Sequence, residues 1–167
     1  DYYFRNPEDQ DRIYTVDMGR NVRRISENIF MKDMHIFNGY IFYANTNTSD
    51  HEDIDFTDRN IYRYSTTTGE NTRLTNLDFV NGDDAWLSLN SLVDNYCYFS
   101  YSNGQDGIYH ICRVNTDGQD FTELFTIPAG QNVGNPNVSV VDKRYVYFLT
   151  KDGFNCYDME TKQNTVA

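Results

Sequence analysis

Residues 35–43 read His-Ile-Phe-Asn-Gly-Tyr-Ile-Phe-Tyr, two short apolar runs on either side of an Asn-Gly dipeptide. Both residues of a two-residue hairpin turn must tolerate positive φ, so Asn-Gly between apolar runs is the strongest short signal for a β-hairpin. The second run belongs to an aromatic cluster that recurs along the whole chain. Its copies are Tyr2-Tyr3-Phe4, Tyr40-Ile41-Phe42-Tyr43, Tyr96-Cys97-Tyr98-Phe99 and Tyr145-Val146-Tyr147-Phe148.

Each aromatic cluster is followed by a second short apolar element, a turn and a third element. The second elements are Arg12-Ile13-Tyr14, Asn60-Ile61-Tyr62, Gly107-Ile108-Tyr109 and Phe154-Asn155-Cys156-Tyr157. The clusters are spaced in and around the range of about 40 to 50 residues that is typical of four-stranded blade repeats. We therefore expect one domain over residues 1–167, with repeats at approximately 1–28, 33–76, 87–126 and 136–167.

The fixed order of elements predicts an all-β fold made of antiparallel meander sheets. A single such sheet is marginally stable alone, because it has two faces to cover and two open edges. Packing the sheets around an axis as a β-propeller covers the faces, whereas a β-sandwich would not explain the repeat. The first repeat lacks the strand that precedes the cluster in the others. We therefore expect four blades of a larger six- to eight-bladed propeller, with a four-bladed ring or a ring shared by two chains as alternatives.

The second repeat also carries a family resemblance. The pattern that runs from Ile61-Tyr62-Arg63 through Gly69 to Leu74-Thr75 resembles the domain of unknown function 5050. That family comprises bacterial propellers similar to the YWTD modules of lipoprotein receptors, and TolB-like propellers share the Leu-Thr ending. The resemblance implies a secreted or cell-surface bacterial protein and brings no catalytic residues. The fourth repeat departs from the pattern, because both the Gly and the Leu-Thr are missing.

Composition narrows the class of partner. Fourteen Tyr and eleven Phe suit strands, and the formal net charge of −11 disfavours contact with nucleic acid or anionic lipid. No apolar stretch approaches the roughly 20 residues that span a bilayer, so we expect no membrane insertion. The three cysteines have no Cys-x-x-Cys spacing, and we interpret them as small apolar residues, with one disulfide as the alternative.

The long connections are all expected at one end of the blades. They run approximately over residues 45–59, 81–86, 102–107 and 128–136, whereas the turns at the opposite end are short. Binding residues are often found on long loops that a rigid scaffold positions. We therefore expect a protein or carbohydrate ligand to bind on this long-loop face, and further propeller blades, in the same or another chain, to be the other partners.

The longest of these loops is strongly acidic. Carboxylates at short spacing can supply the oxygen ligands that calcium prefers, and this loop contains Asp50, Glu52, Asp53, Asp55 and Asp58. The loop lacks the glycine that makes the sharp turn of the usual calcium loop. We therefore expect no metal and no cofactor, with calcium on these five residues as the alternative.

A second loop contains the only tryptophan. Trp86 follows Asp83 and Asp84, and an indole beside carboxylates can stack on a sugar ring while the acids accept its hydroxyl groups. A Trp there can equally fill the gap between two blades. His35 is expected on an inner strand close to the central channel. These four residues are our predicted ligand site.

No motif of a known catalytic class is present in the sequence, neither a Gly-x-Ser-x-Gly elbow, nor a His-Glu-x-x-His helix, nor a phosphate-binding glycine loop. We therefore predict a non-catalytic binding or scaffold module. The alternative is a polysaccharide hydrolase or lyase in which Asp83, Asp84 and His35 act as acid and base, and a purely structural set of blades is a third possibility.

Overall fold

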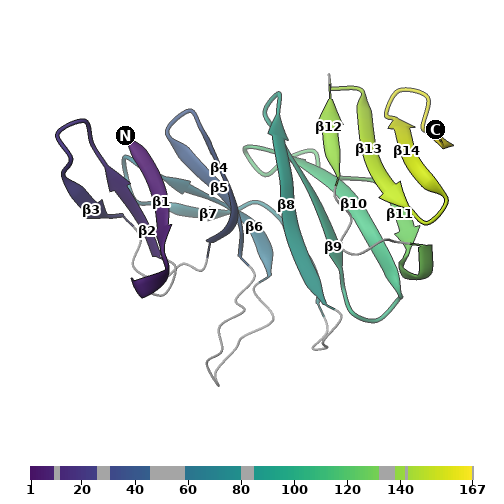
Figure 1. Cartoon of the computed structure of the whole chain (residues 1–167), viewed down its shortest axis with the longest axis horizontal. Helices are drawn as coiled ribbons and strands as arrows, with labels where there is room; N and C mark the ends of the chain where they lie inside the picture. The colour runs from purple at the N-terminus through teal and green to yellow at the C-terminus, as the bar shows by residue number, and fades with distance from the viewer. Residues whose placement is uncertain are drawn as a thin grey trace.

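The computed structural model describes residues 1–9, 12–25, 31–45, 59–79, 85–131, 138–141 and 143–166. The fold is all-β, as predicted, with four antiparallel sheets that follow one another along the chain. Figure 1 shows the sheets side by side, with the N-terminal sheet at one end of the long axis and the C-terminal sheet at the other. We number these sheets 1 to 4 in chain order.

Every sheet is a meander in which neighbouring strands are also neighbours in the sequence. Sheet 1 has three strands, β1 (Tyr2–Asn6), β2 (Arg12–Val16) and β3 (Val22–Arg24). Sheet 2 has four, β4 (Met31–Phe37), β5 (Tyr40–Asn45), β6 (Asn60–Ser65) and β7 (Asn71–Arg73). Sheet 3 comprises β8 (Trp86–Val93), β9 (Tyr96–Ser102), β10 (Ile108–Asn115) and β11 (Thr122–Pro128). Sheet 4 comprises β12 (Ser139–Val141), β13 (Tyr145–Thr150), β14 (Gly153–Asp158) and β15 (Gln163–Val166).

The short turns have the backbone geometry that their residues predict. Asn38 and Gly39 both have positive φ, at 50° and 77°, as the hairpin between β4 and β5 requires. The last turn of sheet 2 places Gly69 at φ 74° and closes with a hydrogen bond from Gly69 N to Ser65 O. Sheet 4 has no glycine at this turn, and Lys162 takes its place at φ 58° with the matching bond to Asp158 O.

Two inner strands are longer than the sequence indicates. The sequence indicated an apolar run only from His35 and placed Trp86 in a loop, but β4 begins at Met31 and β8 begins at Trp86. Each contains a register shift, between Lys32 and His35 in β4 and between Leu89 and Ser91 in β8. A β-bulge of this kind interrupts the alternation of side chains along a strand, so the simple apolar alternation ends before the strand does.

Consecutive sheets pack face to face, and each sheet therefore has two different faces. We call the face toward the following sheet the leading face and the face toward the preceding sheet the trailing face. Ile13 on the leading face of sheet 1 packs with Ile41 and Tyr43 on the trailing face of sheet 2. Sheet 3 contacts sheet 4 in the same way, through Ile111 and Val146.

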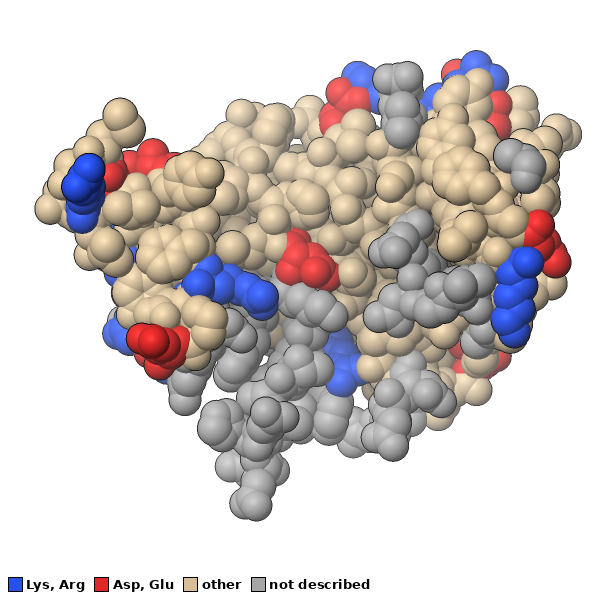
Figure 2. Space-filling model, viewed as in Figure 1, with Lys and Arg blue, Asp and Glu red and all other residues tan. Residues whose placement is uncertain are grey.

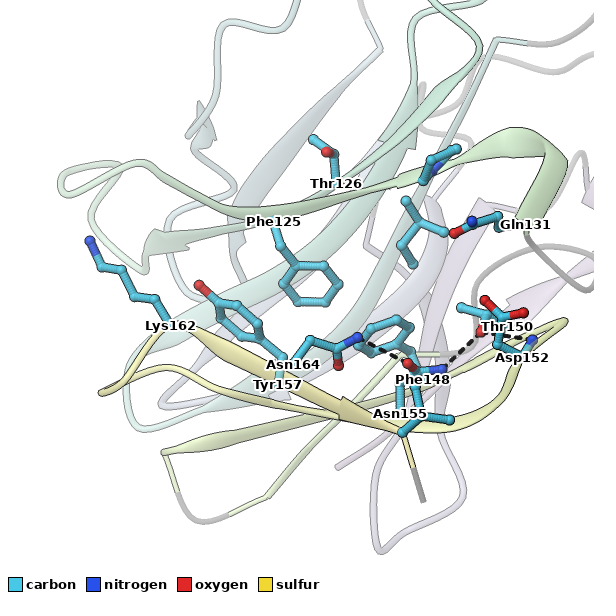
Figure 3. Close-up of a pocket in the computed structure, with 13 residues that line it drawn as sticks. Phe125, Thr126, Gln131, Phe148, Thr150, Asp152, Asn155, Tyr157, Lys162 and Asn164 are labelled. Carbon is cyan, nitrogen blue, oxygen red and sulfur yellow. Dashed lines mark hydrogen bonds between the residues drawn. The ribbon is translucent and has the colours of Figure 1, made fainter.

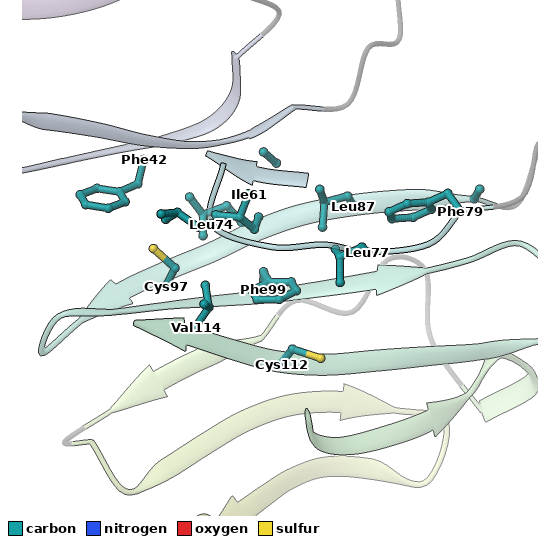
Figure 4. Packing of buried hydrophobic residues seen from close by; sticks show 13 residues of the cluster. Phe42, Ile61, Leu74, Leu77, Phe79, Leu87, Cys97, Phe99, Cys112 and Val114 are labelled. Carbon is teal, nitrogen blue, oxygen red and sulfur yellow. The ribbon is translucent and has the colours of Figure 1, made fainter. Parts of the chain in front are cut away.

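The largest buried cluster lies between sheets 2 and 3 (Figure 4). Phe42 and Ile61 come from sheet 2, and Phe99 and Val114 come from sheet 3. Each of these four side chains is at most 1% exposed. Apolar burial of this kind is the dominant favourable contribution to folding, so the junction between sheets, more than any single sheet, stabilises the fold.

The connections confirm that the two ends of the sheets differ. The antiparallel pairing brings Trp86, Ser102, Ile108 and Pro128 to one end of sheet 3. The connections that leave this end include residues 103–107 and the segment after β11, which begins with a 3-10 turn at Ala129–Gln131. Connections at the opposite end of sheets 2 and 3 are tight turns, such as Asn38-Gly39 and Asp94-Asn95. Among the described residues, no helix is long and apolar enough to cross a membrane.

Replacement of a side chain at the junction between sheets 2 and 3 should strongly reduce stability. Phe99→Ala removes a ring that is fully buried, and a loss of about 3–5 kcal/mol in the free energy of unfolding is expected for such a truncation. Urea unfolding followed by circular dichroism measures it. Met18→Ala is the matched control, since Met18 is 99% exposed and should change stability by less than about 0.5 kcal/mol.

Candidate functional site

Trp86 lies at the long-loop end of sheet 3, as the first residue of β8 and not in a loop. Its ring centroid is 5.3 Å from that of Tyr109 on β10, and the indole is half-buried. The pairing of Trp86 with Ser102 places it on the leading face of sheet 3. The indole therefore contributes to the space between sheets 3 and 4, and its role as a ligand contact stays a prediction.

His35 lies on β4, which neighbours β8 at the inner side of the sheets. The two strands are joined by a hydrogen bond of 2.7 Å from the Ser88 hydroxyl to the Asp33 carboxylate. His35 lies two residues after Asp33, whereas Trp86 lies two residues before Ser88. The structure therefore places the two predicted site residues on neighbouring strands but on opposite sides of this contact.

The acidic residues of the predicted sites lie outside the described residues. These are Asp83 and Asp84, together with the calcium candidates Asp50, Glu52, Asp53, Asp55 and Asp58. Within the described ranges, no group of three or more His, Cys, Asp or Glu side chains is arranged to hold a metal ion.

A cleft of about 220 Å³ lies between sheets 3 and 4, and the sequence did not predict it (Figure 3). Its floor is aromatic. The ring of Phe125 on β11 lies 4.7 Å from that of Phe148 on β13 and 4.5 Å from that of Tyr157 on β14. Figure 3 shows Lys162 at one end of the cleft and Gln131, Thr150 and Asp152 at the other. The second end coincides with the long-loop end of the sheets.

A chain of side-chain amides holds one wall of this cleft in place. Asn164 donates from Nδ2 to Asn155 Oδ1 at 3.0 Å, and Asn155 donates in turn to Thr150 Oγ1 at 2.9 Å. The Tyr157 hydroxyl donates to the Leu124 carbonyl of sheet 3 at 2.9 Å, and burial raises the pKa of this phenol. The wall is therefore held in a single hydrogen-bonded arrangement before any ligand arrives.

One position of the repeat beside the cleft differs between sheets 2 and 4. The aligned residues Tyr43 and Phe148 pair across their strands with Tyr62 and Asn155. In sheet 2 the Tyr62 ring stacks on Tyr43 at 5.6 Å between ring centroids. Asn155 is much smaller, so the equivalent volume beside Phe148 is not filled by a ring. Comparison of Ile61-Tyr62 with Phe154-Asn155 in the sequence was the signal that could have indicated this space.

The exposed polar groups at the cleft suit a neutral, hydroxyl-rich ligand. Thr126, Gln131, Asp152 and Lys162 line it and are exposed, and none of their side chains has a hydrogen bond to another described residue. Together they supply donors and acceptors around an aromatic floor. An apolar surface with a few polar groups that fix orientation is the usual composition of a small-molecule site.

A separate cluster of titratable groups surrounds His110 on β10. Nδ1 lies 2.6 Å from Glu123 Oε2 and Nε2 lies 3.0 Å from Asp106 Oδ2, so each ring nitrogen faces a carboxylate. The imidazole also stacks on Tyr101, with ring centroids 4.6 Å apart. Burial lowers the pKa of His110, but hydrogen bonds and charge from Glu123 and Asp106 outweigh it, and the net shift is upward. When it is protonated, the ring donates one N–H to each of the two carboxylates.

This arrangement is suited to stabilisation of the sheet and not to metal binding. The two carboxylates lie on opposite nitrogens of the ring, so they cannot converge on one cation together with the imidazole. A general base must have a nitrogen that a substrate can reach, and each nitrogen of His110 already faces a carboxylate. The cluster ties the loop at Asp106 to the neighbouring strand β11.

The stability of the fold should fall as the pH rises through the pKa of His110. A histidine whose pKa is raised in the folded state contributes stability that is fully present below its unfolded value, about 6.5, and is lost above the folded value. Unfolding midpoints in urea, measured across neutral pH, test this. His110→Gln should remove the decline. The other two histidines, His35 and His51, remain in both proteins, so any decline that they cause would persist in the variant. A decline of equal size in both would contradict the assignment.

Comparison with solved structures identifies the fold class. A prolyl endopeptidase, from a study of inter-domain dynamics in catalysis and specificity, matches with a TM-score of 0.57 at 12% sequence identity. The match covers 93% of this chain and falls on a protein with a propeller domain, so the sheets are blades of a β-propeller. The chain spans only 22% of the length of that endopeptidase, and the likeness concerns the fold alone.

A nidogen/laminin complex matches more weakly, with a TM-score of 0.35 at 8% identity over 98% of this chain and 90% of that chain. A TM-score this low does not show that the two folds are the same. No protein-family model matches the sequence, and no curated protein matches it. The resemblance to the domain of unknown function 5050 therefore stays a prediction.

Proposed function

We propose that this propeller module binds a neutral glycan in the cleft between sheets 3 and 4, without turning it over. The observation that supports this most directly is the aromatic floor of Phe125, Phe148 and Tyr157 with polar side chains around it. A sugar ring has an apolar face that can lie on aromatic rings and hydroxyl groups that need directed hydrogen bonds. The amide chain from Asn164 to Thr150 keeps these features in place, which lowers the entropy cost of binding.

Position and charge are consistent with this proposal. One end of the cleft, at Gln131 and Asp152, opens where the long connections leave the sheets, which is the face on which we expected a ligand. The net charge of −11 disfavours nucleic acid and anionic lipid as ligands, whereas a neutral glycan is not repelled. Figure 2 shows acidic and basic side chains of the described residues scattered over the visible face, without a large patch of one sign.

The same cleft gives little support to glycan cleavage. Glycoside hydrolysis generally uses two carboxyl groups at a fixed separation, and among the described residues that line the cleft Asp152 is the one carboxylate. We therefore propose a binding role for the module in a bacterial extracytoplasmic protein, in keeping with the family resemblance of the second repeat. A protein ligand on the long-loop face is the alternative within the same class.

Binding of neutral oligosaccharides, screened on a glycan array and measured by calorimetry, tests the proposal. Asn155→Tyr places in the cleft the ring that sheet 2 has at the same position, and should weaken binding at least about tenfold, or 1.4 kcal/mol. Asp152→Ala at the exposed rim should act in the same direction without affecting the fold. Asp117→Ala, in an exposed turn at the opposite end of sheet 3, is the matched control and should bind normally.

The other outcomes distinguish the alternatives. Glycan binding that survives both cleft variants but is lost in Trp86→Ala would place the site at the loops and contradict the cleft. Release of reducing ends from a polysaccharide would favour the hydrolase, and eliminated products would favour the lyase. No saturable binding of any glycan on the array would reject the proposal.

A further inference from the structure

The junction between sheets 2 and 3 contains an arginine that reaches the next sheet. The guanidinium of Arg63 on β6 lies over the Tyr40 ring, with 4.8 Å between Cζ and the ring centroid. Its Nη1 donates a hydrogen bond of 3.0 Å to the carbonyl of Thr116, in the turn after β10. The guanidinium therefore lies on a ring of its own sheet and donates to the backbone of the following sheet.

Sheet 3 repeats the first part of this arrangement. Arg113 on β10 occupies the position of Arg63, since each lies two residues before the strand partner of the first tyrosine in its aromatic cluster. Arg113 Cζ lies 4.6 Å from the centroid of the Tyr96 ring, so this guanidinium also lies on an aromatic ring of its own sheet. The two arginines are therefore held in the same way.

The bond to the following sheet is where the two arginines differ. Met159 of sheet 4 corresponds to Thr116, since the N–H of each donates at 2.8 Å to the residue before the aromatic cluster of its sheet. Within the described part of the chain, the Arg113 side chain makes no hydrogen bond or ion pair, to Met159 or to any other residue. Instead, Arg113 and Met159 both line a pocket of about 400 Å³ between sheets 3 and 4.

Two lysines of sheet 4 line the same pocket, and both replace residues that are uncharged in sheet 2. Lys162 takes the turn position of Gly69, and Lys143 takes that of Asn38, two residues before the aromatic cluster. Both lysines keep the positive φ of these turns, which is uncommon for a residue with a long side chain. Lys143 forms an ion pair with Asp94 at 2.8 Å, whereas the Lys162 side chain is exposed and has no partner among the described residues.

Two carboxylates also line this pocket, but each is paired with a cation outside its described lining. Glu123 Oε2 lies 2.6 Å from His110 Nδ1, and Glu160 Oε2 lies 3.0 Å from Arg144 Nη1. Of the charged side chains in the described lining, Arg113 and Lys162 are therefore the two that form no ion pair with a described residue. Although the whole chain has a formal net charge of −11, this pocket favours an anion.

We propose that the pocket binds a tetrahedral oxyanion, of the phosphate or sulfate type, between Arg113 and Lys162. A guanidinium offers paired N–H donors that match two oxygens of such a group, and an ammonium adds a compact charge with three donors. Three cations around one pocket suit a dianion better than a singly charged carboxylate. The ring of Tyr96 holds the guanidinium in place before the anion arrives, which reduces the cost of ordering it.

This site is separate from the glycan proposal and does not rest on it. Both of its walls come from sheets of this chain, at the end opposite the long loops. Tyr157 and Lys162 line both this pocket and the aromatic cleft, so the two hollows adjoin (Figure 3). Inorganic phosphate is therefore the suitable probe, because its binding can be measured without any glycan.

Calorimetric titration of the whole chain with inorganic phosphate at low ionic strength tests the proposal, with saturable binding at one site as the expected result. Lys162→Gly and Arg113→Gln should each weaken binding at least about tenfold, since each removes a charged donor. The glycine of the first variant is the residue that sheet 2 has in this turn, so the fold should be retained, which circular dichroism verifies. Lys151→Asn, at the exposed β13–β14 turn of the opposite end, is the matched control and should bind normally.

Two further titrations define the ligand. Chloride at the same ionic strength should not displace phosphate, since a single spherical charge gains nothing from the two donors of the guanidinium. The pocket is larger than one phosphate group requires, so a hexose phosphate that binds more tightly than inorganic phosphate would identify a phosphate ester as the ligand. Weaker binding of the ester would identify the free anion.

Three results would overturn the proposal. Absence of saturable phosphate binding would leave the Met159 carbonyl as the acceptor for Arg113, as Thr116 is for Arg63. Binding of native strength in both Lys162→Gly and Arg113→Gln would place the anion elsewhere on the molecule. Displacement of phosphate by chloride at equal concentration would show a general attraction of anions and not an oxyanion site.

Discussion

The packing of one sheet face on the next is the interaction on which this structure depends. A four-stranded meander of this size cannot cover either of its own faces, and strand pairing alone leaves an isolated sheet marginal. The clusters at Ile13–Ile41, at Phe42–Phe99 and at Ile111–Val146 each join two consecutive sheets. The cleft and its hydrogen-bonded wall lie at the last of these junctions, between sheets 3 and 4.

The repeat made the fold predictable, because three independent features of the sequence recur with it. The aromatic clusters, the Asn38-Gly39 turn and the fixed order of elements all indicated antiparallel blades, and the structure and the propeller likeness confirm that architecture. The strand starts at Met31 and Trp86 were missed for a physical reason. A bulge in each strand shifts the alternation of side chains, so the apolar period that marks the rest of the strand is lost near its beginning.

The candidate site was much less predictable than the fold. The cleft lies beside Asn155, where sheet 2 has the larger Tyr62, and the significance of this difference appears only when the sheets are stacked. The bonds of His110 were also beyond sequence reasoning, since Asp106 and Glu123 lie in a loop and on another strand. Of the residues predicted to bind a ligand, Trp86 and His35 lie at separate points along neighbouring strands, and Asp83 and Asp84 lie outside the described residues.

The left-handed backbone at Lys162 has a consequence for how such repeats can diversify. The turn in sheet 2 uses Gly69, which has no side chain to offer a ligand, whereas sheet 4 keeps the same hydrogen-bonded turn with a lysine at a conformational cost of roughly 1 kcal/mol. That cost is small compared with the burial at one junction, so the scaffold tolerates it. A position reserved for glycine by backbone geometry thus becomes variable in one blade, and an ammonium group can be placed beside an aromatic cleft without any change in chain path.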